Sequence, residues 1–471
     1  MGELRRARSE VAPAPFLVSA ILEGLLQTEY REVVYAVPDE ADRYCVAAAR
    51  HACIKEGKHG RGLAIFANDS DLIVFDSGPY TTIIPLNDLI NREGHDGKRA
   101  LSGAEICPAE LSRDWKCDSL VELAWHMSQH TTLSVRECRA RMISGRAPTS
   151  QEYLEFAAQY QLDTHPLVLE RLQKDIDERV SYASMDARVS ELVHQAGDAD
   201  RLGTSDLDLF LPFLTEDPTR TSAWRVGTRD RQLAYEALLY ATANNATVLE
   251  YKRAAERVSA AKLQGWEFGT LSDRLRERIG LARVQLKDCM QVTNDRLSGW
   301  RLFVIRVLLQ DFVWEDWTFP PPEEVVAVNT GRACKTWELV HLSAQYQAAF
   351  YSLRMLAQIA RYVLRTHSEK AEALFLSELV SLLAGLPSLA EFFEPDHGTV
   401  QEAESIWMPV IETSMKELNP HWTPPKEVEK KGKGRKSRKR KAGNEATGRG
   451  TEKGQQNRSP MANPFAALEA D

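Results

Sequence analysis

Four carboxylates stand where a metal-dependent reaction would need them. Glu40 and Asp42 follow the β-branched run 31–37, and Asp69 and Asp71 follow the apolar run 62–67. The carboxyl ends of parallel strands share one edge of a sheet, so we expect these side chains to converge. Converging carboxylates repel one another unless cations lie among them, and hard oxygen ligands favour Mg²⁺ or Mn²⁺. Ions held in this way activate water for phosphodiester hydrolysis.

The same acids also admit a structural interpretation. Glu40 and Asp42 would stabilise the N-terminus of a helix, and Asp69 and Asp71 are typical of a turn whose side chains bind backbone N–H groups. Either pair alone favours this interpretation. The two pairs together, on neighbouring strands, favour the metal site.

An α/β sheet must position these acids. The sequence predicts strands at 31–37, 62–67, 72–75 and 81–86. A helix over 40–57 connects the first two strands, and strand, helix and strand in short succession indicate a parallel Rossmann-type sheet. We expect a further helix at 14–30 to pack on that sheet.

After about residue 110 the pattern becomes helical, with apolar residues three and four positions apart. The expected helices are 118–129, 150–162, 166–180, 229–243, 248–263 and 337–367. We therefore predict three parts: an α/β domain over 1–145 with an internal region at 30–90, an all-helical region over 146–425, and a tail over 426–471.

Composition and cysteine usage limit the classes of protein to which the chain can belong. The chain has 471 residues, of which 43% are hydrophobic and 27% charged, as expected of a globular protein, and no apolar run is long enough to cross a membrane. Its seven cysteines are sparse and lack a Cys-x-x-Cys pair, which is typical of a reducing compartment. We predict neither secretion nor a membrane location.

The tail is basic although the net charge is −8. Residues 430–441 hold nine basic side chains in twelve positions, among them Arg435, Lys436, Arg438, Lys439 and Arg440. Without apolar residues this segment is predicted to be disordered. It would serve as a nuclear-import address read by an import receptor, as an arm that binds phosphates, or only as a solvated tail. We predict a nuclear protein.

A second basic stretch lies at 222–235. Arg225, Arg229 and Arg231 stand near Trp224 and Tyr235, a mixture that could contact a nucleic-acid strand. The alternative is that the aromatic side chains are core and that the arginines pair with Asp230, Glu236 and their neighbours. The alternative is favoured. Further on, Glu250 and Arg253 are predicted to pair on a helix face.

The acidic motifs resemble a known family. Residues 37–57 and 62–78, "VPDEADRYCVAAARHACIKEG" and "GLAIFANDSDLIVFDSG", resemble the internal region of the flap-endonuclease/XPG nuclease superfamily. That region reads P-x-E-A-[ED] at the start of a helix and x-x-D-x-D after a strand. Residues 14–25, 209–239 and 248–258 make the chain most similar to the asteroid branch. The resemblance covers about residues 14–290.

The resemblance implies a PIN-like Rossmann-type domain that cleaves branched or single-stranded DNA with Mg²⁺ or Mn²⁺ in DNA repair. By position, Glu40, Asp42, Asp69 and Asp71 would be metal ligands. The sequence begins after the early strand and two aspartates of such domains, so we expect a partial domain with an open sheet edge. Either the true start lies further upstream or the chain is a degenerate member. His130 replaces a later metal-binding aspartate, and a neutral imidazole weakens Mg²⁺ binding.

These departures leave two hypotheses open. One is an active Mg²⁺- or Mn²⁺-dependent endonuclease acting on DNA. The other is a catalytically impaired adaptor that keeps the fold and binds nucleic acid or proteins through its helices and its basic tail.

Overall fold

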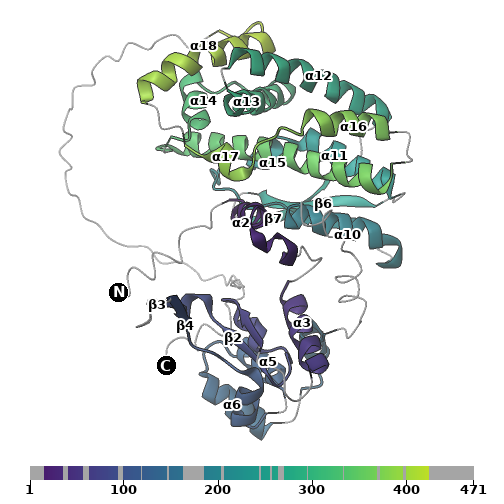
Figure 1. Ribbon diagram of the computed structural model, residues 1–471, viewed down its shortest axis with the longest axis vertical. Coiled ribbons are helices and arrows are strands. Elements are labelled where there is room, and N and C mark those ends of the chain that lie inside the picture. Colours follow the sequence, from purple (N-terminus) through teal and green to yellow (C-terminus); the bar gives the residue numbers. More distant parts are fainter. Residues whose placement is uncertain are drawn as a thin grey trace, which may run out of the picture. The chain divides into compact units, whose positions relative to one another are not determined.

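The chain divides into two units in this computed structural model. The described residues are 15–34, 41–56, 63–93, 99–117, 119–145, 148–162, 185–202, 206–242, 246–254, 257–263, 270–293, 295–332, 334–368, 372–395 and 399–423. The large unit comprises Met1–Asp39 and Ile176–Val428, and the small unit comprises Glu40–Asp175 and Glu429–Asp471. Each unit is coloured by its place in the sequence in Figure 1. The described residues include no helix that could span a membrane.

A parallel strand pair organises the small unit. Strand β1 (Leu63–Phe66) pairs in parallel with β2 (Thr81–Ile84), with Leu63 opposite Thr81. The 3-10 helix η3 (Ser70–Ile73) lies in the connection between them. On its other side β2 forms an antiparallel bridge at Ile106, so β1 lies at the edge of the sheet that the described residues form. The remaining elements are α3 (Ala41–Glu56), η4 (Leu86–Asp88), the antiparallel pair β3 (Ile90–Glu93) and β4 (Arg99–Ser102), and helices α4 (Pro108–Trp115), α5 (Leu120–Gln129), α6 (Val135–Ser144) and α7 (Gln151–Gln159).

The core of the small unit lies under η3 and β2. Leu72, Ile83 and Leu123 are almost fully buried and form one apolar cluster with Val46 of α3 and Cys138 of α6. Helix α6 begins with a capping box between Ser134 and Glu137, which satisfies backbone N–H groups at its N-terminus. These contacts hold the connection after β1 in a defined position.

The large unit combines a three-stranded sheet with a helical layer. Strand β5 (Asp206–Phe210) is parallel to β6 (Thr247–Ala254), and β7 (Arg257–Leu263) is antiparallel to β6. The connection from β5 to β6 contains η5 (Ala223–Arg225) and α11 (Thr228–Ala241). The other elements are α2 (Leu17–Leu26), η1 (Glu29–Val33), α10 (Ala187–Leu202), α12 (Leu271–Val292), α13 (Arg296–Trp314), α14 (Pro322–Asn329), α15 (Trp337–Thr366), α16 (Ala373–Leu382), α17 (Leu389–Phe393) and α18 (Val400–Leu418).

Helix α15 is the centre of the large unit's core. It packs against α11, α13, α14 and α16, as can be followed in Figure 1, and most of its side chains are buried. Phe350 stacks on Phe392 of α17 with ring centroids 3.8 Å apart. Phe16, just before α2, stacks on Tyr351 at 4.6 Å, which fixes the N-terminal helix to α15.

The predicted fold class is confirmed. The structure is mixed α/β with small parallel sheets and many helices. Strands at 62–67 and 81–86 are present, and the helices expected at 14–30, 40–57, 118–129, 150–162, 229–243 and 337–367 form over their described cores. The helix predicted at 166–180 lies outside the described residues, and so does the basic tail after residue 423.

Three predictions about individual elements are wrong. Residues 29–33 form the 3-10 helix η1 where a strand was expected over 31–37, and 35–37 lie outside the described residues. Residues 72–75 belong to η3 and the turn after it. Residues 248–263 form the hairpin of β6 and β7, so the region after 146 is not all-helical. Within the large unit, Phe16 at the start of α2 packs on Tyr351 of α15, and the predicted packing of this helix on the β1–β2 sheet stays a prediction.

Candidate metal and nucleic-acid sites

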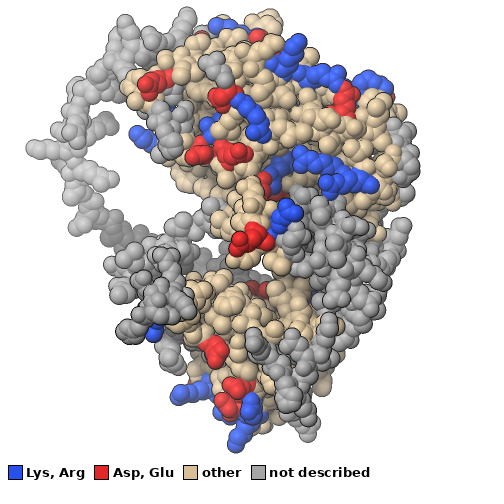
Figure 2. Space-filling view, viewed as in Figure 1, with Lys and Arg blue, Asp and Glu red and all other residues tan. Residues whose placement is uncertain are grey.

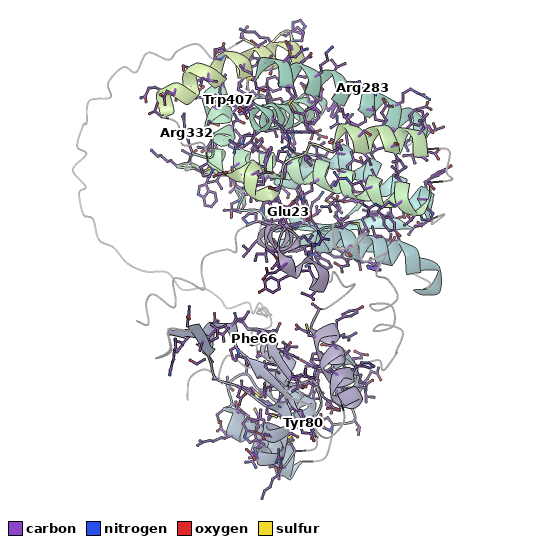
Figure 3. All side chains as sticks on the ribbon, viewed as in Figure 1. Glu23, Phe66, Tyr80, Arg283, Arg332 and Trp407 are labelled. Atoms are coloured by element: carbon purple, nitrogen blue, oxygen red, sulfur yellow. The ribbon has the colours of Figure 1, made fainter. Side chains whose placement is uncertain are left out.

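Asp69 and Asp71 lie at the carboxyl end of β1, as the sequence predicts. Asp69 caps the N-terminus of η3, and its Oδ1 accepts a hydrogen bond from the Asp71 N–H at 3.0 Å. The neighbouring Asn68 ties this turn to the segment after β2, because its Oδ1 accepts the Asn87 N–H at 2.9 Å. The two acids therefore stand at the shared carboxyl edge of the parallel pair. Figure 3 labels Phe66, the last residue of β1.

The electrostatics around this pair favour a bound cation. Burial raises the pKa of the Asp71 carboxyl, and the charge of Asp69 raises it further. Burial, followed by the charges of Asp71 and Asp69, raises the pKa of Tyr160 to about 12. Both raised pKa values indicate a negative electrostatic potential at a partly desolvated site. A bound cation would reduce this potential. Tyr160 follows α7 and is a residue that the sequence did not single out for this site.

The beginning of α3 meets the same part of the small unit. Arg43 Nη2 donates to the Gln159 carbonyl oxygen at 3.0 Å, next to Tyr160 in the chain. Asp42 lies in the first turn of α3, and Glu40 lies outside the described residues. Within the described part of the chain, no three His, Cys, Asp or Glu side chains gather to hold a metal. The convergence of all four carboxylates therefore stays a prediction, and the structure brings together Asp69 and Asp71.

The residues of this pair fit Mg²⁺ or Mn²⁺ by the chemistry of their donors. Carboxylate oxygens are the hard ligands that these ions prefer, and burial, together with the charge of Asp69, raises the pKa of the Asp71 carboxyl, a shift that a bound cation would oppose.

His130 has a protein partner. It follows α5, and its Nε2 lies 3.0 Å from Nη1 of Arg141 on α6. A guanidinium can only donate, so the Nε2 lone pair accepts this hydrogen bond and is not free for a metal. The ring would have to break this contact to become a ligand through Nε2.

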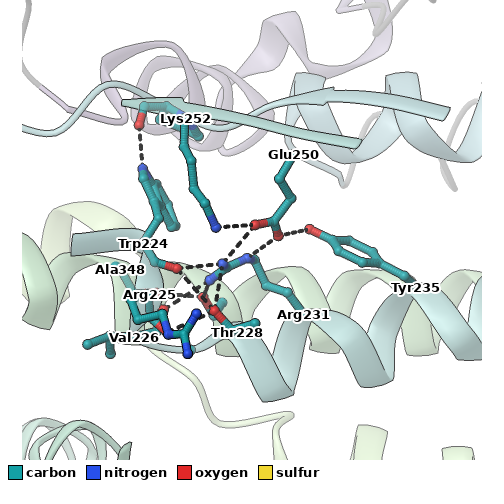
Figure 4. A network of polar contacts seen from close by, with 12 residues as sticks. Trp224, Arg225, Val226, Thr228, Arg231, Tyr235, Glu250, Lys252 and Ala348 are labelled. Atoms are coloured by element: carbon teal, nitrogen blue, oxygen red, sulfur yellow. Dashed lines mark hydrogen bonds and ion pairs between the residues drawn. The ribbon is translucent and has the colours of Figure 1, made fainter. Parts of the chain in front are cut away.

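Arg231 cannot contact nucleic acid, which corrects one predicted site residue. Its side chain has 0% exposed surface, and Nε and Nη2 bind the two carboxylate oxygens of Glu250 at 2.6 and 3.1 Å. Figure 4 shows the network around this pair. Nη1 also donates to Ser352 Oγ of α15 and to the Val226 carbonyl oxygen. Arg231 therefore joins α11, β6 and α15 in the core.

Arg225 and Arg229 make contacts with other side chains near the protein surface. Arg225 pairs with Glu315 at 2.8 Å and is 54% exposed, while the Arg229 guanidinium lies over the Trp314 ring, 4.1 Å from its centroid. Trp224 and Tyr235 are buried, which confirms the alternative that assigned them to the core.

The acids expected to pair with these arginines bind elsewhere. Asp230 binds Arg278, and Glu236 binds Arg274. The predicted Glu250–Arg253 pair is wrong, because Arg253 binds Glu216 at 2.7 Å.

Comparison with known proteins adds one finding. A family model described as "XPG domain containing" matches residues 13–264, which is more than half of the chain. The matched range contains α2, the described elements of the small unit and the sheet β5–β6–β7. No curated protein and no solved structure matches the chain.

Proposed function

Because the chain belongs to the family of XPG-domain-containing proteins, we propose that it is a metal-dependent, structure-specific nuclease of the asteroid kind that acts on DNA. The observation that carries this proposal is the pair Asp69 and Asp71 at the carboxyl edge of β1 and β2, where Asp71 has a raised pKa. A role in DNA repair, a nuclear location and an import receptor bound to residues 430–441 belong to the same proposal.

The chain's own residues would prepare the site in three ways. Asp69 and Asp71 hold the cation, with Glu40 and Asp42 as further ligands. The Asn68–Asn87 hydrogen bond fixes the turn that carries the pair. The Tyr160 hydroxyl, whose pKa is raised to about 12 by burial and by the charges of Asp71 and Asp69, stays protonated and adds no negative charge beside the pair. Mg²⁺ or Mn²⁺, when bound, activates a water and stabilises the leaving oxygen.

The test is cleavage of labelled flap and single-stranded DNA in Mg²⁺ and in Mn²⁺. We expect metal-dependent cutting by the wild type that falls below detection in the double variant Asp69→Ala/Asp71→Ala. The matched control is Asp114→Asn, which removes an exposed carboxylate from α4. Metal should also raise the melting temperature of the wild type and of the control variant, but not that of the double variant. A folded wild type that neither cuts nor gains stability from metal would contradict the proposal.

One observation favours the adaptor as a second candidate. The hydrogen bond from Arg141 occupies Nε2 of His130, and the described residues bring only two carboxylates together. An adaptor would bind DNA without cutting it, in a salt-sensitive manner that is lost on deletion of residues 430–441. Binding that survives this deletion would contradict a role of the tail.

A further inference from the structure

Three arginines share one face of the last part of α15. Arg354, Arg361 and Arg365 are seven and four positions apart, which places their side chains on the same side of the helix. Arg354 forms ion pairs with two carboxylates. Its Nε and Nη2 bind Asp186 at 2.7 Å each, and its Nη1 binds Glu23 of α2. Glu23 is labelled in Figure 3.

The other two arginines have no counter-charge among the residues that the structure describes. Arg361 is half-buried and Arg365 is exposed, and neither makes an ion pair or a hydrogen bond within the part of the chain that the structure describes. Burial, and then the charges of Arg354 and Arg365, lower the pKa of the Arg361 guanidinium. Figure 2 shows basic side chains gathered on the large unit in the region of α15.

The helix dipole does not account for this arrangement. Cations near a helix C-terminus are stabilised by the dipole, but the effect falls off within the last turn. Arg365 lies in the last turn of α15, whereas Arg361 lies more than one turn before the final residue Thr366. Two like charges side by side, one of them partly desolvated, are unfavourable unless an anion binds between them.

We propose that Arg361 and Arg365 form a phosphate-binding site that contacts the backbone of the DNA substrate. Guanidinium groups present paired N–H donors that match phosphate oxygens. The site is held rigidly, because the neighbouring Ile359, Tyr362 and Val363 are buried in the core of the large unit. It lies outside residues 13–264, so the family match does not include it. The choice of DNA as the source of the phosphate rests on the proposed function.

The test is binding of a labelled flap DNA by the full chain, measured by fluorescence anisotropy in EDTA over a range of NaCl concentrations. EDTA separates binding from cutting. The variant Arg361→Gln/Arg365→Gln should bind roughly tenfold more weakly. Its slope of log K against log salt should be shallower by about 1.4–1.8, as for two lost phosphate contacts. Arg361→Lys/Arg365→Lys keeps the charge and should restore most of the slope.

The matched control removes two arginines of α12 that already have carboxylate partners. Arg276 pairs with Asp273, and Arg283 pairs with Glu378. The variant Arg276→Gln/Arg283→Gln should leave the salt slope unchanged. Thermal melting of every variant establishes that it is folded.

Failure of this inference is distinguishable from failure of the proposed function. If Arg361→Gln/Arg365→Gln binds DNA with the wild-type slope, the phosphate site is refuted, whether or not the protein cuts. If inorganic phosphate stabilises the wild type more than this variant while DNA binding is unchanged, the site takes free phosphate and the assignment to DNA is overturned. A loss of slope in a protein that does not cut supports the site and counts against the nuclease.

Discussion

At the scale of single residues, the Glu250 carboxylate keeps its charge without any exposed surface. Burial alone would raise its pKa, but the charge and hydrogen bonds of Arg231, together with Lys252 and the Tyr235 hydroxyl, lower it to about 2. The guanidinium and the carboxylate meet in a bidentate pair, and further donors satisfy the remaining lone pairs. Such a pair tolerates removal of one partner poorly, because the other charge stays buried.

We expect Glu250→Gln to lower the free energy of unfolding by about 3–5 kcal/mol, since it leaves Arg231 buried without a counter-charge. The pH dependence has a defined sign. A carboxyl with a depressed pKa stabilises the folded state above its unfolded value of 4.5, and this stabilisation is lost as the pH falls towards about 2.

Urea unfolding of wild type and Glu250→Gln between pH 7 and pH 3 measures both effects. The difference between the two proteins should shrink as the pH falls. Glu277→Gln is the control, because Glu277 is an exposed carboxylate of α12. A Glu250→Gln protein as stable as this control at pH 7 would contradict the prediction.

The sequence alone reached part of the candidate site. The spacing of Asp69 and Asp71 after an apolar run was sufficient to place them at a strand end. Tyr160 and Arg141 were not found, because each comes next to its partner only through the packing of helices, and no local pattern marks them. Arg231 was misassigned for the same reason: the sequence shows an arginine near aromatics but not the carboxylate of Glu250, nineteen positions away, that binds it.

At the scale of elements, the main error concerns the hairpin of β6 and β7. Residues 248–263 contain apolar side chains at helical spacing, but Val248 and Glu250 alternate with more exposed neighbours and face the core. Pairing of β6 with β5 on one side and β7 on the other outweighs helix propensity. Helices with a continuous apolar stripe, such as α15, were predictable because their pattern is long and their burial agrees with it.

The start of α11 depends on a glycine. Gly227 has φ +73°, and a Cβ atom there would lie 2.3 Å from Ser352 Oγ and 2.5 Å from Ser352 Cβ. We expect Gly227→Ala to reduce stability by about 2–4 kcal/mol, from backbone strain and from the collision with α15. Urea denaturation measures the change. Gly280→Ala is the control, because a Cβ in this part of α12 meets nothing within 4 Å and should stabilise the helix by about 0.5–1 kcal/mol. Equal stabilities for the two variants would contradict this account.

At the scale of the whole molecule, the described residues form two separate apolar cores. One contains Leu123 and Ile83 in the small unit, and the other contains Leu353, Phe350 and their neighbours in the large unit. Separate cores are the physical basis for separate unfolding events.

We expect two thermal transitions in scanning calorimetry. Leu123→Ala should lower one melting temperature and Leu353→Ala the other. Each substitution should reduce the free energy of unfolding of its own unit by roughly 2–5 kcal/mol, the usual cost of truncating a buried leucine. Because each substitution removes the same atoms from a fully buried position, the two variants serve as controls for one another. A single transition that both variants shift equally would show that the cores unfold together.

The attachment of α2 has a consequence for the order in which the protein can form. Glu23 binds Arg354 and accepts the backbone N–H of Leu389, so its partners are translated more than 300 residues after it. At about 5–20 residues per second, the ribosome needs roughly 20–70 s to deliver them. Residues Glu40–Asp175 of the small unit are inserted in the sequence of the large one, and the described elements of the small unit are translated long before then. During synthesis the elements of the small unit are therefore all translated while α2 still lacks the partners that fix it in the large unit.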